Sequence, residues 1–365
     1  MKIEKSVTTQ VLPKKFKLSH AVFTVWLLTF FVVLVGIVFG VGLFYHTWWY
    51  YFKTEAHLTD SQVVAMVRQG LQHKISQTDE HKNILILGID QLSNRENEPV
   101  LTDTVLLVSI DTQSGAVHMI SIPRDLWSSE YKTKINALYT YGKDRYPDKP
   151  ELFPTEVIAN LTQVPIHHTL LISLDQLKEL IDAIGGVHIQ IPESFTDTQF
   201  PRSDVDIKTE HDPAKLYESV SFKQGEELMA GDRALIYLRS RHSENKNQGT
   251  DDARSLRQQT VIAAIIQKLQ SNEVIQNARS LGKVVHWYRS NYETVLSSEE
   301  LIQLAYHLRN SLHSIALDSY TLSISTPDVN GVIFHPPQTK YSQWVYEIED
   351  VAAFQQEIHQ KLAIE

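Results

Sequence analysis

Three segments far apart in the chain contain arginines that could bind an anion and aspartates that could bind a metal ion. They are Asp90 with Asp103, then Arg124 and Asp125 with Lys134 and Asn136, and finally Arg239, Arg241, Asp252, Arg254, Arg257 and Gln258. The third segment is the most informative. If 235–241 is a strand, Arg239 and Arg241 point to the same face of it.

The DDARSLRQQ stretch that follows predicts a helix over 251–269. Asp251 or Asp252 is expected to cap its start. Arg254, Arg257 and Gln258 stand at i, i+3 and i+4 and therefore on one face. Free backbone N–H groups and the helix dipole already favour an anion at that end.

Four neighbouring arginines repel one another unless a negative group lies between them. Guanidinium forks bind phosphate oxygens bidentately, so the pattern indicates a phosphate or pyrophosphate. The alternative is a solvated network of salt bridges with Asp251, Asp252 and Glu244.

Asp90 and Asp103 stand at the end of one predicted strand and the start of the next. Two carboxylates at strand ends could hold Mg²⁺, although turn capping is the alternative for any two loop aspartates. The neighbours Arg124 and Asp125 are open to a similar alternative, a surface ion pair or turn.

The elements around these residues alternate between strands and helices, which predicts a layered α/β/α domain with a central mixed β-sheet. Strands are expected at 83–90, 104–110, 116–122, 187–191, 234–241 and 320–324, and helices at 154–161, 174–184, 251–269, 274–288, 298–312 and 349–362. The DTQSG turn predicts that the second and third strands form a hairpin.

Composition excludes several classes of function. The chain has no cysteine, so disulfides, thiolate metal sites and cysteine nucleophiles are ruled out. Five lysines and one glutamate precede the first apolar segment and together give a charge of +4. Since the net charge of the whole chain is −9, the residues after that segment carry a charge of −13. Such an acidic body argues against nucleic-acid binding. The sequence also lacks the H-E-x-x-H, Walker and G-x-S-x-G patterns.

About 25 uncharged residues, 21–45, are long enough to cross a membrane. The lysines before them and the aromatic residues 48–51 after them predict a cytoplasmic N-terminus. A cleaved signal peptide is the alternative. We expect a cytoplasmic tail at 1–20, a transmembrane helix at 21–45, an extracellular stalk and first helix at 46–82, and one globular domain at 83–365.

Seven segments, in this order, resemble the LytR-CpsA-Psr family of cell-wall glycopolymer transferases. They are NILILGID, TDT, SIPRD, KIN, IDAIGGVHI, FKQGEELMAGDRALIYLRSRH and DDARSLRQQ, and together they cover about residues 83–269. The resemblance implies a membrane enzyme that holds a polyprenyl-pyrophosphate-linked glycan with arginines and Mg²⁺. It also implies that the lipid tail lies in an apolar pocket and that the glycan phosphate passes to a peptidoglycan hydroxyl.

Carried over to matching positions, the resemblance gives each polar residue a role. It places Asp90 and Asp103 at the metal and makes Asp103, Arg124 and Arg241 catalytic, with Asp103 a candidate acceptor for the hydroxyl proton. The pyrophosphate is expected to bind Arg124, Arg239, Arg241, Arg254, Arg257 and Gln258. The supporting residues are Asp125, Lys134, Asn136 and Asp252, and among them Asp125 is expected to orient Arg124. Leu101 departs from the family, which usually has arginine there, and Arg95 is a candidate substitute.

The resemblance leaves the polymer open among teichoic acid, capsule and other wall polysaccharides. Two other functions also stay open. One is a pyrophosphatase that acts on the same lipid, and the other is a membrane-anchored regulator without catalysis.

Overall fold

The computed structural model describes residues 20–89, 99–202, 205, 210–243, 245, 247–309, 317–337, 339–341 and 343–364. It divides into two compact units, one ending at Tyr50 and the other comprising Tyr51–Glu365.

The first unit consists of most of helix α1, His20–Glu55. Within the described residues, Leu28–Glu55 is long and apolar enough to cross a membrane, and its aliphatic side chains are exposed in the isolated chain. The helix runs ten residues beyond the predicted end of the apolar segment, because no glycine or proline interrupts 46–55. The direction of crossing stays a prediction.

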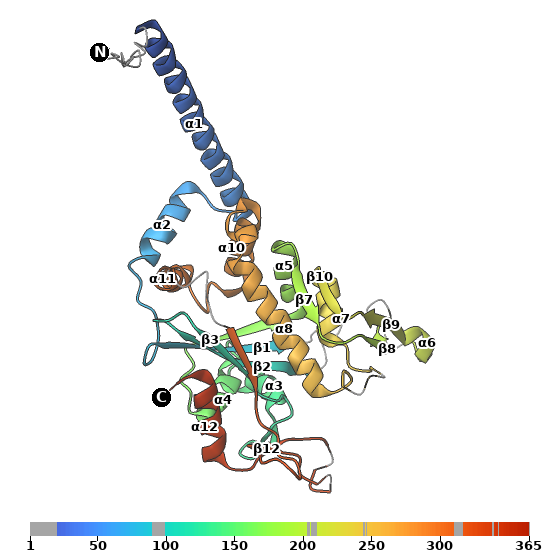
Figure 1. Ribbon diagram of the computed structural model, residues 1–365. Coiled ribbons are helices and arrows are strands. Elements are labelled where there is room, and N and C mark those ends of the chain that lie inside the picture. The colour runs from blue at the N-terminus through green and yellow to red at the C-terminus, as the bar shows by residue number, and fades with distance from the viewer. Residues whose placement is uncertain are drawn as a thin grey trace, which may run out of the picture. The chain divides into compact units, whose positions relative to one another are not determined.

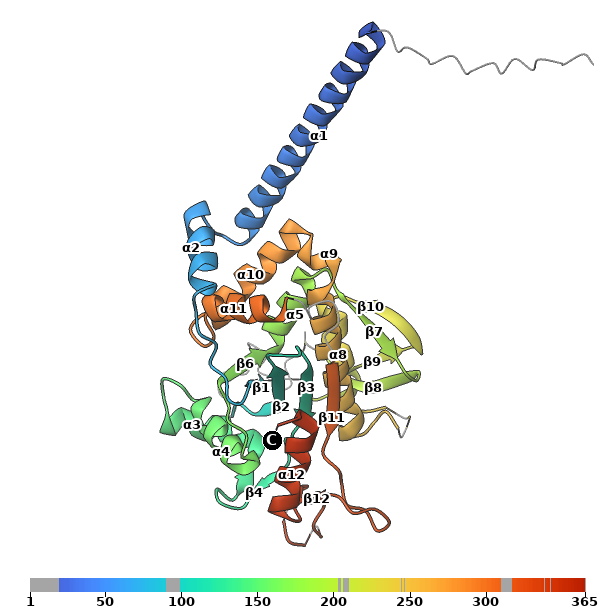
Figure 2. The same ribbon diagram turned by 60° about the vertical axis from the view of Figure 1, so that its left-hand side comes forward.

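The second unit is built on a five-stranded mixed sheet in the order β11-β3-β2-β1-β6 (Figures 1 and 2). Its strands are β1 (His81–Ile89), β2 (Thr102–Asp111), β3 (Val117–Ser121), β6 (His168–Ser173) and β11 (Leu317–Thr321). The strands β1, β2 and β3 pair antiparallel in chain order, whereas β6 and β11 add parallel strands at the two edges. The expected β2–β3 hairpin is confirmed. Its turn is closed by the Asp111 carboxylate, which accepts the backbone N–H groups of Gln113 and Ser114.

Helices cover both faces of this sheet (Figures 1 and 2). On one face, Leu85, Leu107 and Ile120 pack in a core with helices α4 (Leu152–Thr162) and α12 (Val351–Leu362). On the other, Leu106 and Met119 pack against α8 (Asp251–Gln270). Alternate residues of β2 thus enter opposite cores, as the twofold period of a strand requires. The predicted α/β/α layering is confirmed.

A second core lies where α8 meets α5 (Leu174–Ala183), β7 (Val187–Ile191), β10 (Gly225–Met229) and α7 (Gly231–Arg239). The prediction of a strand at 234–241 is wrong, because this stretch forms most of α7. Ala234, Tyr237 and Leu238 are buried at i, i+3 and i+4, which is the period of a helix. Arg239 is therefore the last residue of a helix, and the strand-face argument that paired it with Arg241 fails.

Shorter elements complete the unit. They are α2 (Asp60–Gly70), β4 (Trp127–Ser128), β5 (Thr133–Lys134), the 3₁₀ turn η1 (Ile135–Ala137), α3 (Leu138–Arg145), β8 (Phe195–Pro201), α6 (Pro213–Leu216), β9 (Tyr217–Phe222), α9 (Asn272–Ile275), α10 (Ala278–Tyr292), α11 (Ser298–Leu308), β12 (Ile333–Phe334) and β13 (Glu347–Ile348). The helix expected at 274–288 is divided between α9 and α10. The end of the one expected at 298–312 lies outside the described residues.

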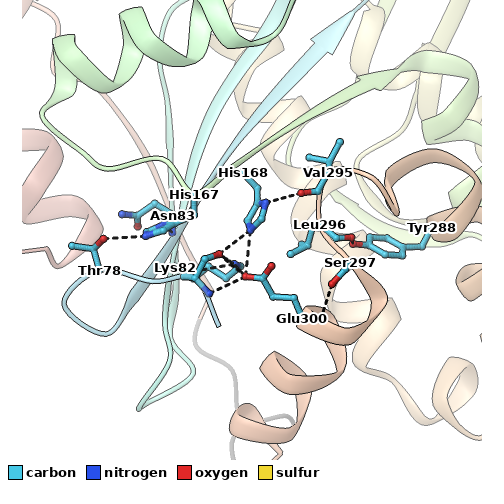
Figure 3. Close-up of polar contacts among 11 residues, drawn as sticks. Thr78, Lys82, Asn83, His167, His168, Tyr288, Val295, Leu296, Ser297 and Glu300 are labelled. Carbon is cyan, nitrogen blue, oxygen red and sulfur yellow. Dashed lines mark hydrogen bonds and ion pairs between the residues drawn. The ribbon is translucent and has the colours of Figure 1, made fainter. Parts of the chain in front are cut away.

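A buried polar network ties α11 to the sheet (Figure 3). Lys82 of β1 is fully buried and forms an ion pair with Glu300 of α11. Its ammonium also donates to the Ser76 hydroxyl at 3.0 Å. Burial opposes the charge of Glu300, yet the hydrogen bonds from Lys82 and Ser76 lower its pKa to about 2. The His168 ring of β6 lies 3.3 Å from the same carboxylate, and its Nδ1 donates to the Val295 carbonyl at 2.8 Å.

Candidate active site

Asp103 stands where the ladder between β1 and β2 changes register. Gly88 pairs with Thr104 and Ile89 pairs with Thr102, so Asp103 is the extra residue of a β-bulge. Bulges redirect a side chain at the end of a strand and are frequent beside active sites. This local irregularity gives the Asp103 carboxylate a direction that regular pairing would not give it.

Two arginines from distant segments converge on this carboxylate. Arg124, just after β3, donates to Asp103 Oδ1 at 2.7 Å, and Arg254, in the first turns of α8, donates to Oδ2 at 3.1 Å. Burial would raise the pKa of Asp103, but the positive charges of Arg254 and Arg124 and their hydrogen bonds lower it below its ordinary value. Asp103 is therefore ionised at neutral pH and bridges two cations that would otherwise repel each other.

The segment after Arg124 contacts both the side chain and the backbone of this arginine. Asp125 Oδ2 lies 3.3 Å from Arg124 Nε, and Asp125 Oδ1 accepts from Lys134 Nζ at 2.6 Å. The backbone N–H of the buried Asn136 donates to the Arg124 carbonyl at 3.1 Å. Asp125 and Asn136 thus position Arg124 directly, and Lys134 holds the Asp125 carboxylate.

A cavity of about 300 Å³ opens on one side of the Asp103 cluster; it is the more polar of the two cavities at the site and is called the polar cavity. It is lined by Asp103, Arg124, Asp125, Arg254, Ser255 and Gln258 together with Ser121, Thr321, Leu322, Ile324 and Tyr346. The last four come from a part of the chain to which the sequence assigned no chemistry. No local motif marks them, because only the pairing of β11 with β3 and the return of the chain near Tyr346 bring them to the site.

An apolar cavity of about 280 Å³ opens on the other side. Its wall on α8 follows one helical face, with Val261, Ile262, Ile265, Ile266 and Leu269 continuing the face of Arg254 and Gln258. Aliphatic residues of β1, β6 and α5 form the remaining wall, and Asp103, Arg239 and Arg254 contribute polar groups to it. Asp103, Thr104, Arg254 and Gln258 line both cavities, so the charged cluster stands at their junction.

Arg257 and Arg241 are not among the residues that line the two cavities. The guanidinium of Arg257 donates to the carbonyls of Ser240 at 2.5 Å and Gln248 at 3.1 Å, and it lines neither cavity. Arg241 is exposed and also lines neither cavity, while its backbone N–H donates to the buried Asp197 at 2.8 Å. Of the predicted arginines, Arg124, Arg239 and Arg254 thus line the cavities, whereas Arg241 and Arg257 do not.

The remaining predictions concern Arg95 and the acidic residues. Asp90 and Arg95 lie outside the described residues, as do Glu244 and the side chain of Asp252. The prediction that Asp251 or Asp252 caps α8 is wrong, because the Thr250 hydroxyl accepts the Ala253 N–H at 3.1 Å. Within the described part of the chain, no group of three or more histidine or acidic side chains is placed to hold a metal ion.

An α/β/α domain whose arginine–carboxylate cluster separates a polar from an apolar cavity is suited to bind an amphiphilic anion. The LytR-CpsA-Psr family model matches residues 48–350, so the chain belongs to this family.

Named relatives agree with that assignment. One is TagV of Bacillus subtilis strain 168, named a polyisoprenyl-teichoic acid–peptidoglycan teichoic acid transferase, which is 28% identical over 269 residues. That match covers 70% of this chain but only 61% of TagV. TagU of the same strain carries the same description and is 22% identical over 314 residues, 85% of this chain and 90% of TagU.

Solved structures share the fold. The crystal structure of B. subtilis TagV has a TM-score of 0.52 at 20% identity and covers 79% of this chain and 100% of that one. A Streptococcus agalactiae protein has a TM-score of 0.55 at 19% identity, with 78% and 89% covered.

Proposed function

We propose that this protein transfers a glycopolymer of the teichoic acid class from polyprenyl pyrophosphate to a peptidoglycan hydroxyl and forms a phosphodiester. The observation that carries the proposal is the junction of the two cavities at Asp103 and Arg254. A pyrophosphate held there has its lipid tail in the apolar cavity and its glycan and the acceptor in the polar one. The names of the TagV and TagU relatives support the choice of polymer and acceptor.

The arginines supply binding and charge stabilisation. Arg124 and Arg254 turn from Asp103 to the phosphate oxygens, and Arg239 reaches the pyrophosphate from the wall of the apolar cavity. The acceptor oxygen bonds to the phosphorus that carries the glycan, and the bond from that phosphorus to the bridging oxygen breaks. Polyprenyl phosphate leaves with that bond's electron pair, and these cations stabilise the charge that develops on it.

Asp103 has a positioning role in this scheme. A carboxylate whose pKa is lowered by two arginines is a weak base. We therefore assign the hydroxyl proton to solvent in the polar cavity rather than to Asp103. The carboxylate holds both guanidinium groups at the junction before substrate arrives, which reduces the reorganisation needed on binding.

We propose Mg²⁺ as the cofactor. This ion binds through one or two carboxylates together with substrate phosphates, and Asp103 at the junction offers a donor of that kind. Asp90 is the second proposed ligand. When bound, Mg²⁺ would neutralise charge on the pyrophosphate.

Helix α1 is proposed to anchor the protein in the cytoplasmic membrane, with its N-terminus inside and the catalytic domain outside. The length of the apolar segment supports the crossing, and the lysines that precede it support this orientation.

The test uses the full-length protein in vesicles with a polyprenyl-pyrophosphate-linked glycan and peptidoglycan fragments. Mass spectrometry should detect a phosphodiester between glycan and fragment. The product should disappear with EDTA and return with Mg²⁺. Glycan phosphate released whether or not fragments are present would identify a pyrophosphatase instead, and lipid binding without any product would identify a regulator.

A further inference from the structure

Helix α2 starts almost directly after the candidate membrane helix. Only residues 56–59 separate Glu55, the last residue of α1, from Asp60. Lys53 in the last turn of α1 donates to the Asp60 carboxylate at 2.8 Å. Thr59 and Gln62 form a capping box that fixes where α2 begins. The start of α2 is therefore held close to the end of α1.

One side of α2 is packed and another is open. Val63 and Gly70 are buried, and a Cβ at Gly70 would come within 2.7 Å of Ile302 in α11. In contrast, Val64, Val67 and Leu71 are 60%, 42% and 47% exposed. At 100° per residue these three side chains fall within about 60° of one another. We call Val64, Val67 and Leu71 the α2 stripe.

The α2 stripe is held rigidly with respect to the active site. The helix α2 packs on α11, which the Glu300–Lys82 ion pair fastens to β1 (Figure 3). The same strand β1 and its neighbour β6 carry Gly88 and Leu170 in the wall of the apolar cavity. A surface that touched the α2 stripe would thus set the orientation of the whole catalytic unit.

We propose that the α2 stripe docks on the lipid surface beside the point where α1 leaves the membrane, with its aliphatic side chains at the boundary between headgroups and acyl chains. The inference rests on the proposed membrane crossing of α1. Glu55 lies ten helical residues, about 15 Å, beyond the end of the uncharged segment at Tyr45, and the interfacial layer is roughly 5–8 Å thick on each side of the hydrocarbon core. The four connecting residues span at most about 14 Å, which is enough to bring α2 back to that layer. Arg68 is exposed at the edge of the α2 stripe and suits anionic headgroups.

The absence of cysteine makes the test direct, because one introduced cysteine is a unique labelling site. We choose Val64→Cys and Val67→Cys for the α2 stripe. The exposed Gln69, roughly 160° around the same helix from Leu71, and the 58% exposed Val329 between β11 and β12 serve as controls after substitution by cysteine. Phe39→Cys reports on the membrane segment.

Each variant of the full-length chain is labelled with an environment-sensitive fluorophore and reconstituted in phosphatidylglycerol–phosphatidylcholine vesicles. Some vesicles contain lipids brominated near the top of the acyl chain. We expect labels at positions 64 and 67 to shift to the blue and lose most of their fluorescence to these lipids, whereas labels at positions 69 and 329 keep theirs.

Labels at 64 and 67 that match position 329 would overturn the proposal. Shielding at 64 and 67 that ignores brominated lipid and grows with the protein-to-lipid ratio would assign the α2 stripe to a second copy of the chain, and would also overturn it. A further set of vesicles contains lipids brominated deep in the acyl chain. If the label at position 39 keeps its fluorescence in these vesicles, the membrane anchor is wrong as well. That outcome separates an error about α1 from an error about α2.

Discussion

Replacing Arg254 by methionine tests the proposed active site most directly. Methionine keeps much of the volume of this nearly buried side chain but removes its 3.1 Å hydrogen bond to Asp103. A hydrogen bond to a charged group contributes about 1.5–3 kcal/mol. Because Asp103 keeps Arg124, we expect a loss of free energy of unfolding near the lower end of that range. We also expect transfer to fall by about 10²–10³, as when one stabilising donor is removed from an active site.

The two effects separate in the double variant Asp103→Asn with Arg254→Met. Removing both charges together should restore much of the stability lost in the single variant, because no carboxylate is left with one cation. Transfer should stay low. Urea unfolding measures stability, and mass spectrometry of the phosphodiester product in vesicles measures transfer. Arg145→Met is the matched control, since this exposed arginine packs on Phe153 and lines neither cavity. A folded Arg254→Met protein that transfers as well as Arg145→Met would refute the assignment.

Three further results are expected. Ile262→Trp should fill the apolar cavity and, at an overpacking cost of about 1–3 kcal/mol, weaken use of a long polyprenyl carrier by roughly 10–100-fold while a short-chain carrier is used nearly normally, as measured by KM. Glu300→Ala should lower the free energy of unfolding measured in urea by about 3–5 kcal/mol, because it leaves the buried Lys82 ammonium without its carboxylate. A protein with both Lys82→Met and Glu300→Leu should recover most of that loss. Equal losses in the two proteins would contradict this account. The pKa of Glu300 in the folded protein, about 2, lies below its ordinary value of about 4.3. The ionised carboxylate should therefore contribute fully to stability above about pH 4.3, and this contribution should decline as the pH falls toward 2. Thermal melts over this pH range should show a smaller decline for a Glu300→Gln protein.

The sequence predicted the sheet better than the segment before α8. Strands β1 to β3 are continuous apolar runs separated by residues that favour turns, so their type could be predicted, and the short DTQSG turn also made the pairing of β2 with β3 predictable. The run from Ala234 to Arg241 contains Ile236 and Tyr237, which favour strands, and it is too short to show a period clearly. Only its packing against the second core, through Tyr237 and Leu238, makes it helical.

The same limit applies to the arginines. The order of the motifs, through the family that they resemble, was enough to select Arg124 and Arg254 as partners at one site. It was not enough to separate Arg254 from Arg257, which a helical diagram places only about 60° apart. That rotation is sufficient to direct Arg257 to the carbonyls of Ser240 and Gln248. The partner of each arginine is decided by the neighbouring segment, and that information is not local.

The geometry of α8 suggests why charge and apolar surface meet where they do. Arg254 and Leu269 lie about 22 Å apart along the helix at 1.5 Å per residue, and the face between them lines the apolar cavity. Arg254 is therefore at the end of an apolar wall, where nearby low-dielectric surface strengthens its attraction for an anion. The Asp103 carboxylate offsets the cost of keeping two guanidinium groups there before substrate binds. A pyrophosphate with a long apolar tail, the ligand proposed above, would replace that carboxylate and fill the cavity at the same time, whereas free pyrophosphate would gain only the first of these two contributions.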